Sequence, residues 1–285
     1  MLSRSFFAVL AFTAVALPSW AAEPGKVIPL EFGPRPMTTV TFGDHAPVKL
    51  VFDTGAMGTS LDTSLARSYG LPEQGVVRVG SPGGKTPHEG FITTFPSLTV
   101  GDATLQNVRA VAVDSLHKQG EVGVLSPSSF AGSLVAFEFA RSRAVVLPKT
   151  ADTLPKGEAT PYQGPTPGHG LPSLAVSIDG QTMTALLDSG AGYGLTLPLA
   201  LAKTLRLKKP LTPREAIPMM GGTLAAYTGQ LDGTFTVGPV TVKDPEILVL
   251  DGLPVVTVGI QILRGLTIVL DPEEQRSWVL PANAI

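Results

Sequence analysis

Two aspartates occupy the same kind of position in separate parts of the chain. Asp53 follows the apolar run Leu50–Phe52, and Asp188 follows the apolar run Ala185–Leu187. Such runs are typical of buried strands, and a carboxylate beside them is unfavourable unless it is paired, hydrogen-bonded or protonated. If the two acids face each other, repulsion prevents both from ionising. The pair then shares one proton, so that one carboxyl group can act as a base and the other as an acid.

Each aspartate is followed by a hydroxyl residue and a glycine. The triplets continue with Thr54 and Gly55 in the first case and with Ser189 and Gly190 in the second, 135 positions later. Taken singly, either aspartate could simply cap a turn by accepting backbone N–H groups. Capping alone requires neither the apolar run nor the matched hydroxyl and glycine, so the repeated pattern favours a shared role.

The segments around the aspartates form a long internal repeat. Residues 38–71 and 172–207 both predict a strand, a polar turn, a strand, the aspartate triplet, an apolar segment and a short helix. Later features match at separations of 133 to 137 positions, for example Val100 with Val237 and Gly123 with Gly259. The repeat predicts two lobes related by a pseudo-twofold axis, with the aspartates on that axis.

Composition supports a turn-rich β protein with a sizeable core. The 285 residues are 44% hydrophobic and 15% charged, and they include 31 glycines and 26 prolines. We expect an all-β, mainly antiparallel fold with a few short helices. Residues 22–147 would form the N-terminal lobe, 148–171 a Pro-rich linker and 172–285 the C-terminal lobe. A net charge of −2 argues against a nucleic-acid partner.

The first 21 residues have the pattern of a signal peptide. Arg4 precedes the apolar run 6–17, and small residues lead to a cleavage site expected after Ala21. The run is too short to span a bilayer comfortably, and the chain has no cysteine. The sequence therefore predicts a periplasmic or secreted protein without a membrane span. An uncleaved interfacial helix is the alternative.

The segments "FDTGA" and "LDSGA" resemble the aspartic peptidases of the pepsin and retropepsin-like superfamily. The single chain with two plain lobes is similar to bacterial exported members, and the resemblance covers residues 40–280. It implies that Asp53 and Asp188 activate a water molecule for attack on a peptide carbonyl. It also implies supporting roles for the flanking residues. Thr54 and Ser189 would brace the two loops, and Gly55 and Gly190 would let the backbone approach the acids.

The resemblance further implies a β-hairpin flap over the substrate. The candidates are the glycine-rich segments Val77–Gly90 and Ile217–Gln230. The sequence departs from the family in the late loop that backs each aspartate, where relatives usually have two apolar residues and a glycine. Here the departures are Ser126 in the first lobe and Gln261 with Ile262 in the second.

Other kinds of site are disfavoured. Residues 80–86 lack the first glycine of a phosphate-binding loop, since position 79 is Val79. The four histidines lack metal-ligand spacing, so no metal or cofactor is expected. The leading hypothesis is a monomeric aspartic endopeptidase that takes a peptide or protein between its lobes. Two alternatives stay open: an inactive peptide-binding protein of the same fold, and a homodimer in which each aspartate pairs with its copy.

Overall fold

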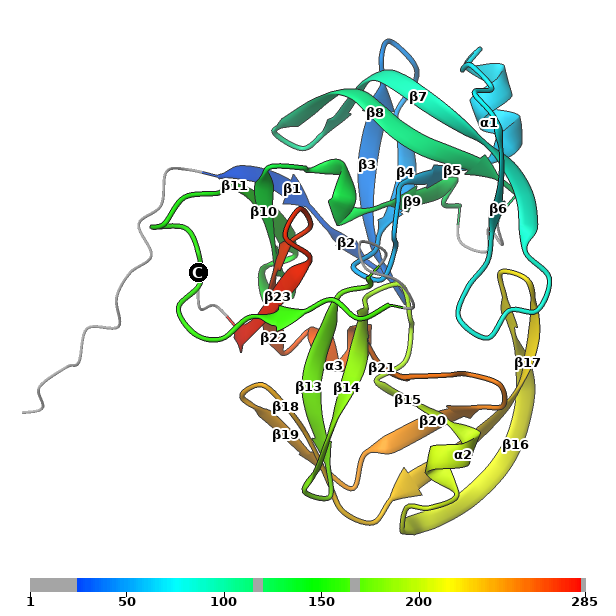
Figure 1. Cartoon of the computed structure of the whole chain (residues 1–285), viewed down its shortest axis with the longest axis vertical. Helices are drawn as coiled ribbons and strands as arrows, with labels where there is room; N and C mark the ends of the chain where they lie inside the picture. Colours follow the sequence, from blue (N-terminus) through cyan, green and yellow to red (C-terminus); the bar gives the residue numbers. More distant parts are fainter. Residues whose placement is uncertain (1–24, 115–119, 165–169, 283–285) are drawn as a thin grey trace, which may run out of the picture.

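The structure is a computed structural model that describes residues 25–114, 120–164 and 170–282. Strands dominate and form two lobes, drawn in the upper and lower halves of Figure 1, so the predicted all-β, two-lobe fold is confirmed. The predicted signal peptide, residues 1–21, lies outside the described residues. In the part of the chain that is described, no helix is long and apolar enough to cross a membrane.

The first lobe is built on an eight-stranded sheet. In spatial order its strands are β2 (Glu31–Phe32), β3 (Pro36–Phe42), β4 (Val48–Phe52), β9 (Gly123–Leu125), β5 (Ser60–Leu61), β8 (Ala103–Val113), β7 (His88–Val100) and β6 (Val76–Val79). β3 also pairs with β7, so the sheet curls around a core that includes Phe42 and Phe95, whose ring centroids are 4.3 Å apart. Helix α1 (Thr63–Ser68) begins after Asp62, whose carboxylate accepts the N–H groups of Ser64 and Leu65.

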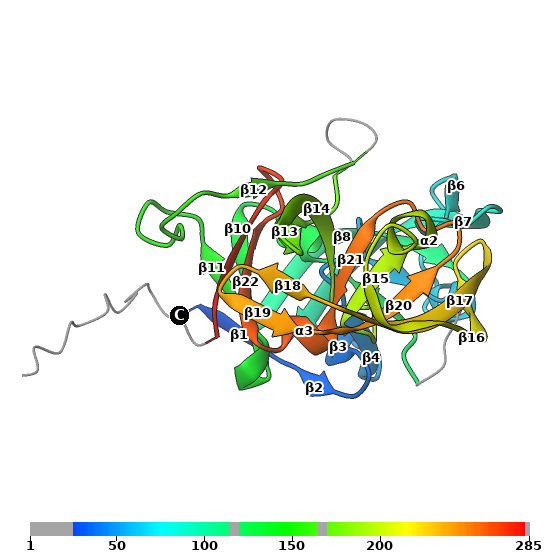
Figure 2. The ribbon, with the colours of Figure 1, turned by 90° about the horizontal axis from the view of Figure 1, so that it is seen from below.

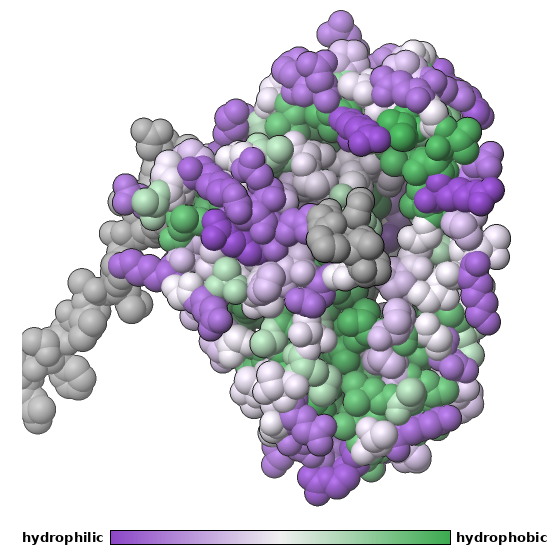
Figure 3. Space-filling model, in the orientation of Figure 1, coloured by the Kyte–Doolittle hydropathy of each residue, from purple (hydrophilic) through white to green (hydrophobic). Residues whose placement is uncertain are grey.

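The second lobe repeats this plan on a nine-stranded sheet. In spatial order its strands are β16 (Leu207–Met219), β17 (Gly222–Leu231), β20 (Glu246–Leu250), β15 (Leu195–Pro198), β21 (Val256–Gly259), β14 (Gln181–Asp188), β13 (Ser173–Ile178), β18 (Thr234–Val237) and β19 (Val240–Lys243). Two short helices, α2 (Leu199–Ala202) and α3 (Ile260–Leu263), follow β15 and β21. Hydrophilic residues occupy much of the outer rim of both lobes in Figure 3.

The polar turn predicted between the first two strands of the second repeat is a hairpin at residues 178–181. Ile178 pairs with Gln181, and the two residues between them, Asp179 and Gly180, have φ angles of 52° and 82°. A two-residue turn with both φ angles positive matches the twist of the flanking strands, and Asp-Gly is one of the sequences that adopts it most readily. This hairpin sets the register of β14, which ends at Asp188.

A third sheet combines strands from both halves of the chain. It has the order β1 (Lys26–Pro29), β11 (Arg143–Pro148), β10 (Ser133–Glu138), β22 (Leu266–Asp271), β23 (Arg276–Pro281) and β12 (Thr160–Pro161). Short 3₁₀ helices, η1 (Pro127–Ser129) and η2 (Phe139–Arg141), flank β10. The antiparallel pair β10–β22 joins the two halves directly, and Figure 2 shows these strands together at one side of the molecule.

The segment predicted as a linker contributes to this third sheet. Thr160 of β12 lies opposite Ser277 of β23, and Gln163 forms a bridge with Leu171. The prolines of this segment do not prevent short pairing, because a strand of two residues at the edge of a sheet needs few backbone donors. The lobes are therefore connected by a paired strap as well as by β10 and β22.

We predict that the third sheet depends on the carboxylate of Asp271, which is fully buried. It accepts hydrogen bonds from Arg276 Nε at 3.0 Å and lies 3.2 Å from Lys149 Nζ. Asp271→Asn keeps the shape but removes the charge, so the free energy of unfolding should fall by about 3 kcal/mol in urea titrations at neutral pH. Glu73→Gln, in an exposed pair with Arg67, is the control and should change it by less than about 0.5 kcal/mol. Equal effects of the two substitutions would contradict the prediction.

Candidate active site

Strands β4 and β14 carry the two aspartates to the centre of the molecule. Both strands are buried just before the acid, and each is flanked by a parallel partner, β9 for β4 and β21 for β14. The Asp53 N–H donates to the Leu125 carbonyl at 3.0 Å, which fixes the start of its loop. The ends of β4 and β14 approach each other between the lobes in Figure 1. The apolar runs found in the sequence are thus the buried strands that hold the acids.

The carboxyl groups of Asp53 and Asp188 are hydrogen-bonded to each other. Oδ1 of Asp53 also accepts the N–H of Gly55 at 2.8 Å and, from the other lobe, the N–H of Gly190 at 3.0 Å. Oδ1 of Asp188 accepts the N–H of Ala191 at 2.8 Å. Both aspartates are only half-buried, so they are partly exposed to solvent.

Burial raises the pKa of both carboxyl groups. For Asp188, desolvation and the neighbouring charge of Asp53 raise the pKa to about 8. Desolvation also raises the pKa of Asp53, but the N–H groups of Gly55 and Gly190 and the positive charge of Arg35 act in the opposite direction. Because these groups favour an ionised Asp53, we assign the shared proton of the pair to Asp188.

Thr54 and Ser189 exchange hydrogen bonds across the boundary between the lobes. The Thr54 N–H donates to Ser189 Oγ, and the Ser189 N–H donates to Thr54 Oγ1, both at 3.0 Å. Each hydroxyl then donates to a carbonyl of the opposite strand, Thr54 to Leu187 and Ser189 to Phe52, both at 3.1 Å. Both side chains are fully buried. The network holds the two aspartate loops at a fixed separation.

Gly55 and Gly190 leave room for the carboxyl groups of the opposite loops. A Cβ atom on Gly55 would lie 3.0 Å from Cγ of Asp188, and one on Gly190 would lie 2.5 Å from Oδ2 of Asp53. Any side chain at these positions would push the aspartates apart. The backbone at both glycines therefore lies directly against the acids.

Strands β9 and β21, which lead into the loops behind the aspartates, correspond to each other with a different residue offset from the one that the sequence indicated. The sequence comparison paired Gly123 with Gly259. In the parallel pairs β4–β9 and β14–β21, however, Ser126 takes the place beside Asp53 that Gly259 takes beside Asp188. That pairing of Gly123 with Gly259 is wrong because parallel register is set by hydrogen bonds between distant strands, which a sequence offset does not show. The second lobe therefore keeps a glycine at this point, and the departure lies in Ser126.

Ser126 supports the first aspartate loop with its side chain. It is fully buried, and its Oγ donates to the Ala56 carbonyl at 2.7 Å. Its N–H donates to Thr59 Oγ1 at 3.0 Å. The hydroxyl of Ser126 therefore ties the late loop to the segment that follows Asp53.

Gly259 and Gln261 support the second aspartate loop in another way. A Cβ atom on Gly259 would lie only 2.1 Å from the Tyr193 carbonyl, so the loop packs directly on the glycine backbone. Two residues later, Gln261 Nε2 donates to the Gly192 carbonyl at 3.0 Å. Ile262 packs against the main core. Both loops are thus supported, the first by a hydroxyl and the second by backbone packing and an amide.

The two predicted flap segments form hairpins whose tips meet. β6 pairs with β7 in the first lobe and β16 with β17 in the second. At the tips, the Ser81 N–H donates to the Met220 carbonyl at 3.1 Å, and the N–H groups of Lys85 and Thr86 donate to the Gly221 carbonyl at 2.9 Å. A Cβ atom on Gly84 would lie 2.3 Å from the Met220 carbonyl, so this contact requires glycine. The hairpins are joined by backbone hydrogen bonds between the lobes.

Sequence reasoning missed an ion pair near the aspartates. Arg35, in the turn between β2 and β3, pairs with Glu121, whose side chain is only 4% exposed. The same turn contacts the second lobe, because Arg264 donates to the Gly33 carbonyl at 2.8 Å. An arginine between two prolines gives no periodic or motif signal. Its role is visible only once the turn is placed beside Asp53.

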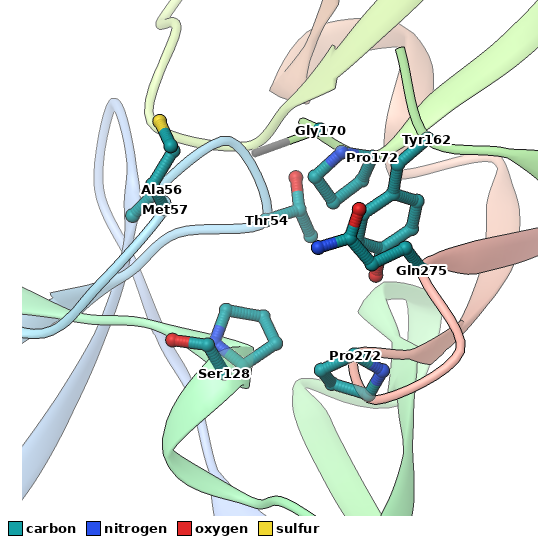
Figure 4. A pocket seen from close by; sticks show the side chains of 10 residues that line it. Thr54, Ala56, Met57, Ser128, Tyr162, Gly170, Pro172, Pro272 and Gln275 are labelled. Atoms are coloured by element: carbon teal, nitrogen blue, oxygen red, sulfur yellow. The ribbon is translucent and has the colours of Figure 1, made fainter. Parts of the chain in front are cut away.

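A small cavity of about 120 Å³ lies beside the first aspartate loop (Figure 4). Thr54 and Met57 line it on one side, and Tyr162, Pro272 and Gln275 line it on the other. Neither aspartate lines it. The cavity therefore lies next to the loop but does not include the aspartate pair.

Comparisons with known proteins identify the same repeat. A family model described as aspartyl protease matches residues 38–128 and residues 174–267, one match in each lobe. A comparison with curated proteins found no match. Among the described residues, no group of three or more histidine, aspartate or glutamate side chains is arranged to hold a metal ion.

We predict that the Thr54 hydroxyl is required for the spacing of the two loops. Thr54→Val keeps the volume but leaves the Ser189 N–H and the Leu187 carbonyl without this buried partner. The free energy of unfolding, measured by urea titration, should fall by about 2–3 kcal/mol. Thr54→Ser retains the hydroxyl and is the matched control, expected to lose less than half as much. If Thr54→Val were no more destabilised than Thr54→Ser, loss of these hydrogen bonds would not explain the effect.

Proposed function

Because the chain belongs to the aspartyl protease family, we propose that it is an exported aspartic endopeptidase that hydrolyses peptide bonds through Asp53 and Asp188. The observation that carries this proposal is the hydrogen-bonded pair of carboxyl groups at the junction of the lobes. Two half-buried carboxyl groups that share one proton supply a base and an acid in the same site.

In the proposed reaction, Asp188 holds the shared proton and Asp53 is ionised. Asp53 takes a proton from water as the water oxygen attacks the peptide carbonyl, while Asp188 donates its proton to the carbonyl oxygen. The resulting gem-diol then collapses and the C–N bond breaks. The leaving nitrogen takes the proton from Asp53, and a diol hydroxyl returns a proton to Asp188. No covalent enzyme intermediate is required.

The proposed substrate is an extended peptide or an unfolded protein segment between the lobes. Hairpins β6–β7 and β16–β17 offer backbone groups at the boundary between the lobes, and extended peptides bind readily by strand pairing. The hydrogen bonds between the hairpin tips have to break before a continuous chain can enter. A folded protein without an extended segment is therefore a poor substrate in this proposal.

Export and a monomeric state complete the proposal. The signal-peptide pattern of residues 1–21 supports a periplasmic or secreted location. Both aspartates belong to one chain, so a single copy is sufficient for the proposed reaction.

We predict that Asp53→Asn and Asp188→Asn each reduce cleavage of an unfolded protein by at least about 10³-fold, because neither variant can share a proton as the wild-type pair does. The measurement is the rate of appearance of new peptide termini, with circular dichroism to show that the fold is intact. Asp152→Asn, outside the site, is the control. Full cleavage by both site variants would refute the proposed pair, and a wild-type protein that binds but never cuts peptides would favour the inactive peptide-binding alternative.

We predict a pH profile set by the carboxyl pair. The active form holds one proton, so kcat/KM should fall as pH rises through the pKa of Asp188, which is raised to about 8, because the acid is then lost. On the acid side, kcat/KM should fall as Asp53 becomes protonated. Removing the Arg35 charge should raise the pKa of Asp53 further. Arg35→Met should therefore shift the acid limb of the profile to higher pH, and an unchanged acid limb would contradict this assignment.

A further inference from the structure

A second, larger cavity of about 440 Å³ lies in the second lobe, outside the aspartate pair. It is enclosed by the long hairpin β16–β17, seen as the curved arm at the lower right of Figure 1, together with β15 and β20. Its walls include Tyr193, Lys209, Arg214, Glu246, Ile247 and Gln261. Its volume is in the range of about 300–1,000 Å³ that is usual for ligand pockets.

The cavity is connected to the active-site loop through the backbone. Tyr193 is five residues after Asp188 in the same loop. Gln261, which also lines the cavity, donates to the Gly192 carbonyl at 3.0 Å and so fixes this part of the loop. The cavity wall therefore continues directly from the loop that carries Asp188.

The charges in the cavity favour an anion. The guanidinium carbon of Arg214 lies over the Tyr193 ring, 5.0 Å from its centroid, in a cation–π contact. Among the described residues Arg214 has no acidic partner within 4 Å. Lys209 and Glu246 are also in the walls, but they offset each other at 4.0 Å. The uncompensated charge of the cavity is therefore the positive charge of Arg214.

We propose that this cavity is a subsite in which Arg214 binds a carboxylate of the peptide substrate, at a position away from the scissile bond. The inference rests on the proposed function and extends it by naming a substrate class, acidic peptides. The Tyr193 ring holds the guanidinium in place, and a planar guanidinium can donate two parallel hydrogen bonds to one carboxylate. The aliphatic wall at Ile247 is suited to the methylene groups of a glutamate side chain.

The test compares matched peptides that differ in one charge. Decapeptides cut by the wild-type protein are synthesised in pairs, with Glu or Gln at each position that does not adjoin the scissile bond. At one position, kcat/KM should be about fivefold higher for the Glu peptide, and the preference should shrink as salt is added. Arg214→Gln should reduce this preference to about one, through a lower kcat/KM for the Glu peptide. A preference that survives in Arg214→Gln, or no position with a preference, would overturn the proposal.

Two further variants test whether the preference for Glu depends on charges in the cavity itself. Lys208→Gln removes the same charge from the same strand, but Lys208 is bonded to Asp244 at 2.7 Å and does not line the cavity, so the Glu preference should not change. Glu246→Gln removes the negative charge from the cavity wall and should increase the preference. An equal loss in Lys208→Gln and Arg214→Gln would show a general charge effect and refute a site at Arg214.

A binding measurement separates failure of this inference from failure of the proposed function. Fluorescein-labelled pools of random decapeptides, one with a fixed Glu and one with a fixed Gln, are titrated with Asp188→Asn, alone and combined with Arg214→Gln. Tighter binding of the Glu pool that depends on Arg214 supports the subsite even if the wild-type protein cuts nothing. Equal binding of both pools refutes it even if cleavage is observed. A further pair of pools, with a free or an amidated C-terminus, shows whether a side-chain or a terminal carboxylate is bound.

Discussion

The structure depends on one electrostatic constraint, the approach of two carboxyl groups that cannot both ionise. Asp53 and Asp188 are hydrogen-bonded to each other, and desolvation raises the pKa of each. A pair of this kind is costly to keep together, because separating the acids would relieve both repulsion and desolvation. Groups that hold the acids in place must therefore come from outside the pair. The backbone N–H groups, the Thr54 and Ser189 network and the third sheet all serve this purpose.

These restraints act at different distances from the acids. The hydroxyl network fixes the loops directly, through bonds in which each lobe donates to the other. The strand pair β10–β22 fixes the position of one lobe relative to the other. Its ladder runs without a break from Val135–Leu270 to Glu138–Thr267. The hairpin tips form a third connection on the side of β6 and β16. The tip bonds are few and involve glycine-rich turns, so this connection is the one that can open without disturbing the pair.

The sequence predicted local elements that occur in both repeats. It did not predict which distant segments of the chain pair with each other. The strand before each acid, the Asp179–Gly180 turn and the two hairpins follow from patterns within a few residues, and the structure has all of them. The match of Gly123 with Gly259 failed because the two parallel pairs differ in loop length. The mixed third sheet, β12 within the strap and the Arg35–Glu121 pair also join residues far apart in the chain, where no periodic pattern shows their contacts.

The repeat makes the two halves alike, but the proposed reaction gives the two acids different roles. With identical surroundings, the shared proton would reside equally on both carboxyl groups. The first lobe breaks this symmetry with Arg35, whose positive charge favours an ionised Asp53. Arg35 is itself paired with Glu121. When Ser126 is matched with Gly259, Glu121 corresponds to Pro254, so the second lobe has no acidic residue at this position. A fused chain can place such a charge on one side only, whereas a homodimer would repeat it on both. Joining two copies in one chain therefore allows the two acids to have different electrostatic surroundings, as the proposed reaction uses.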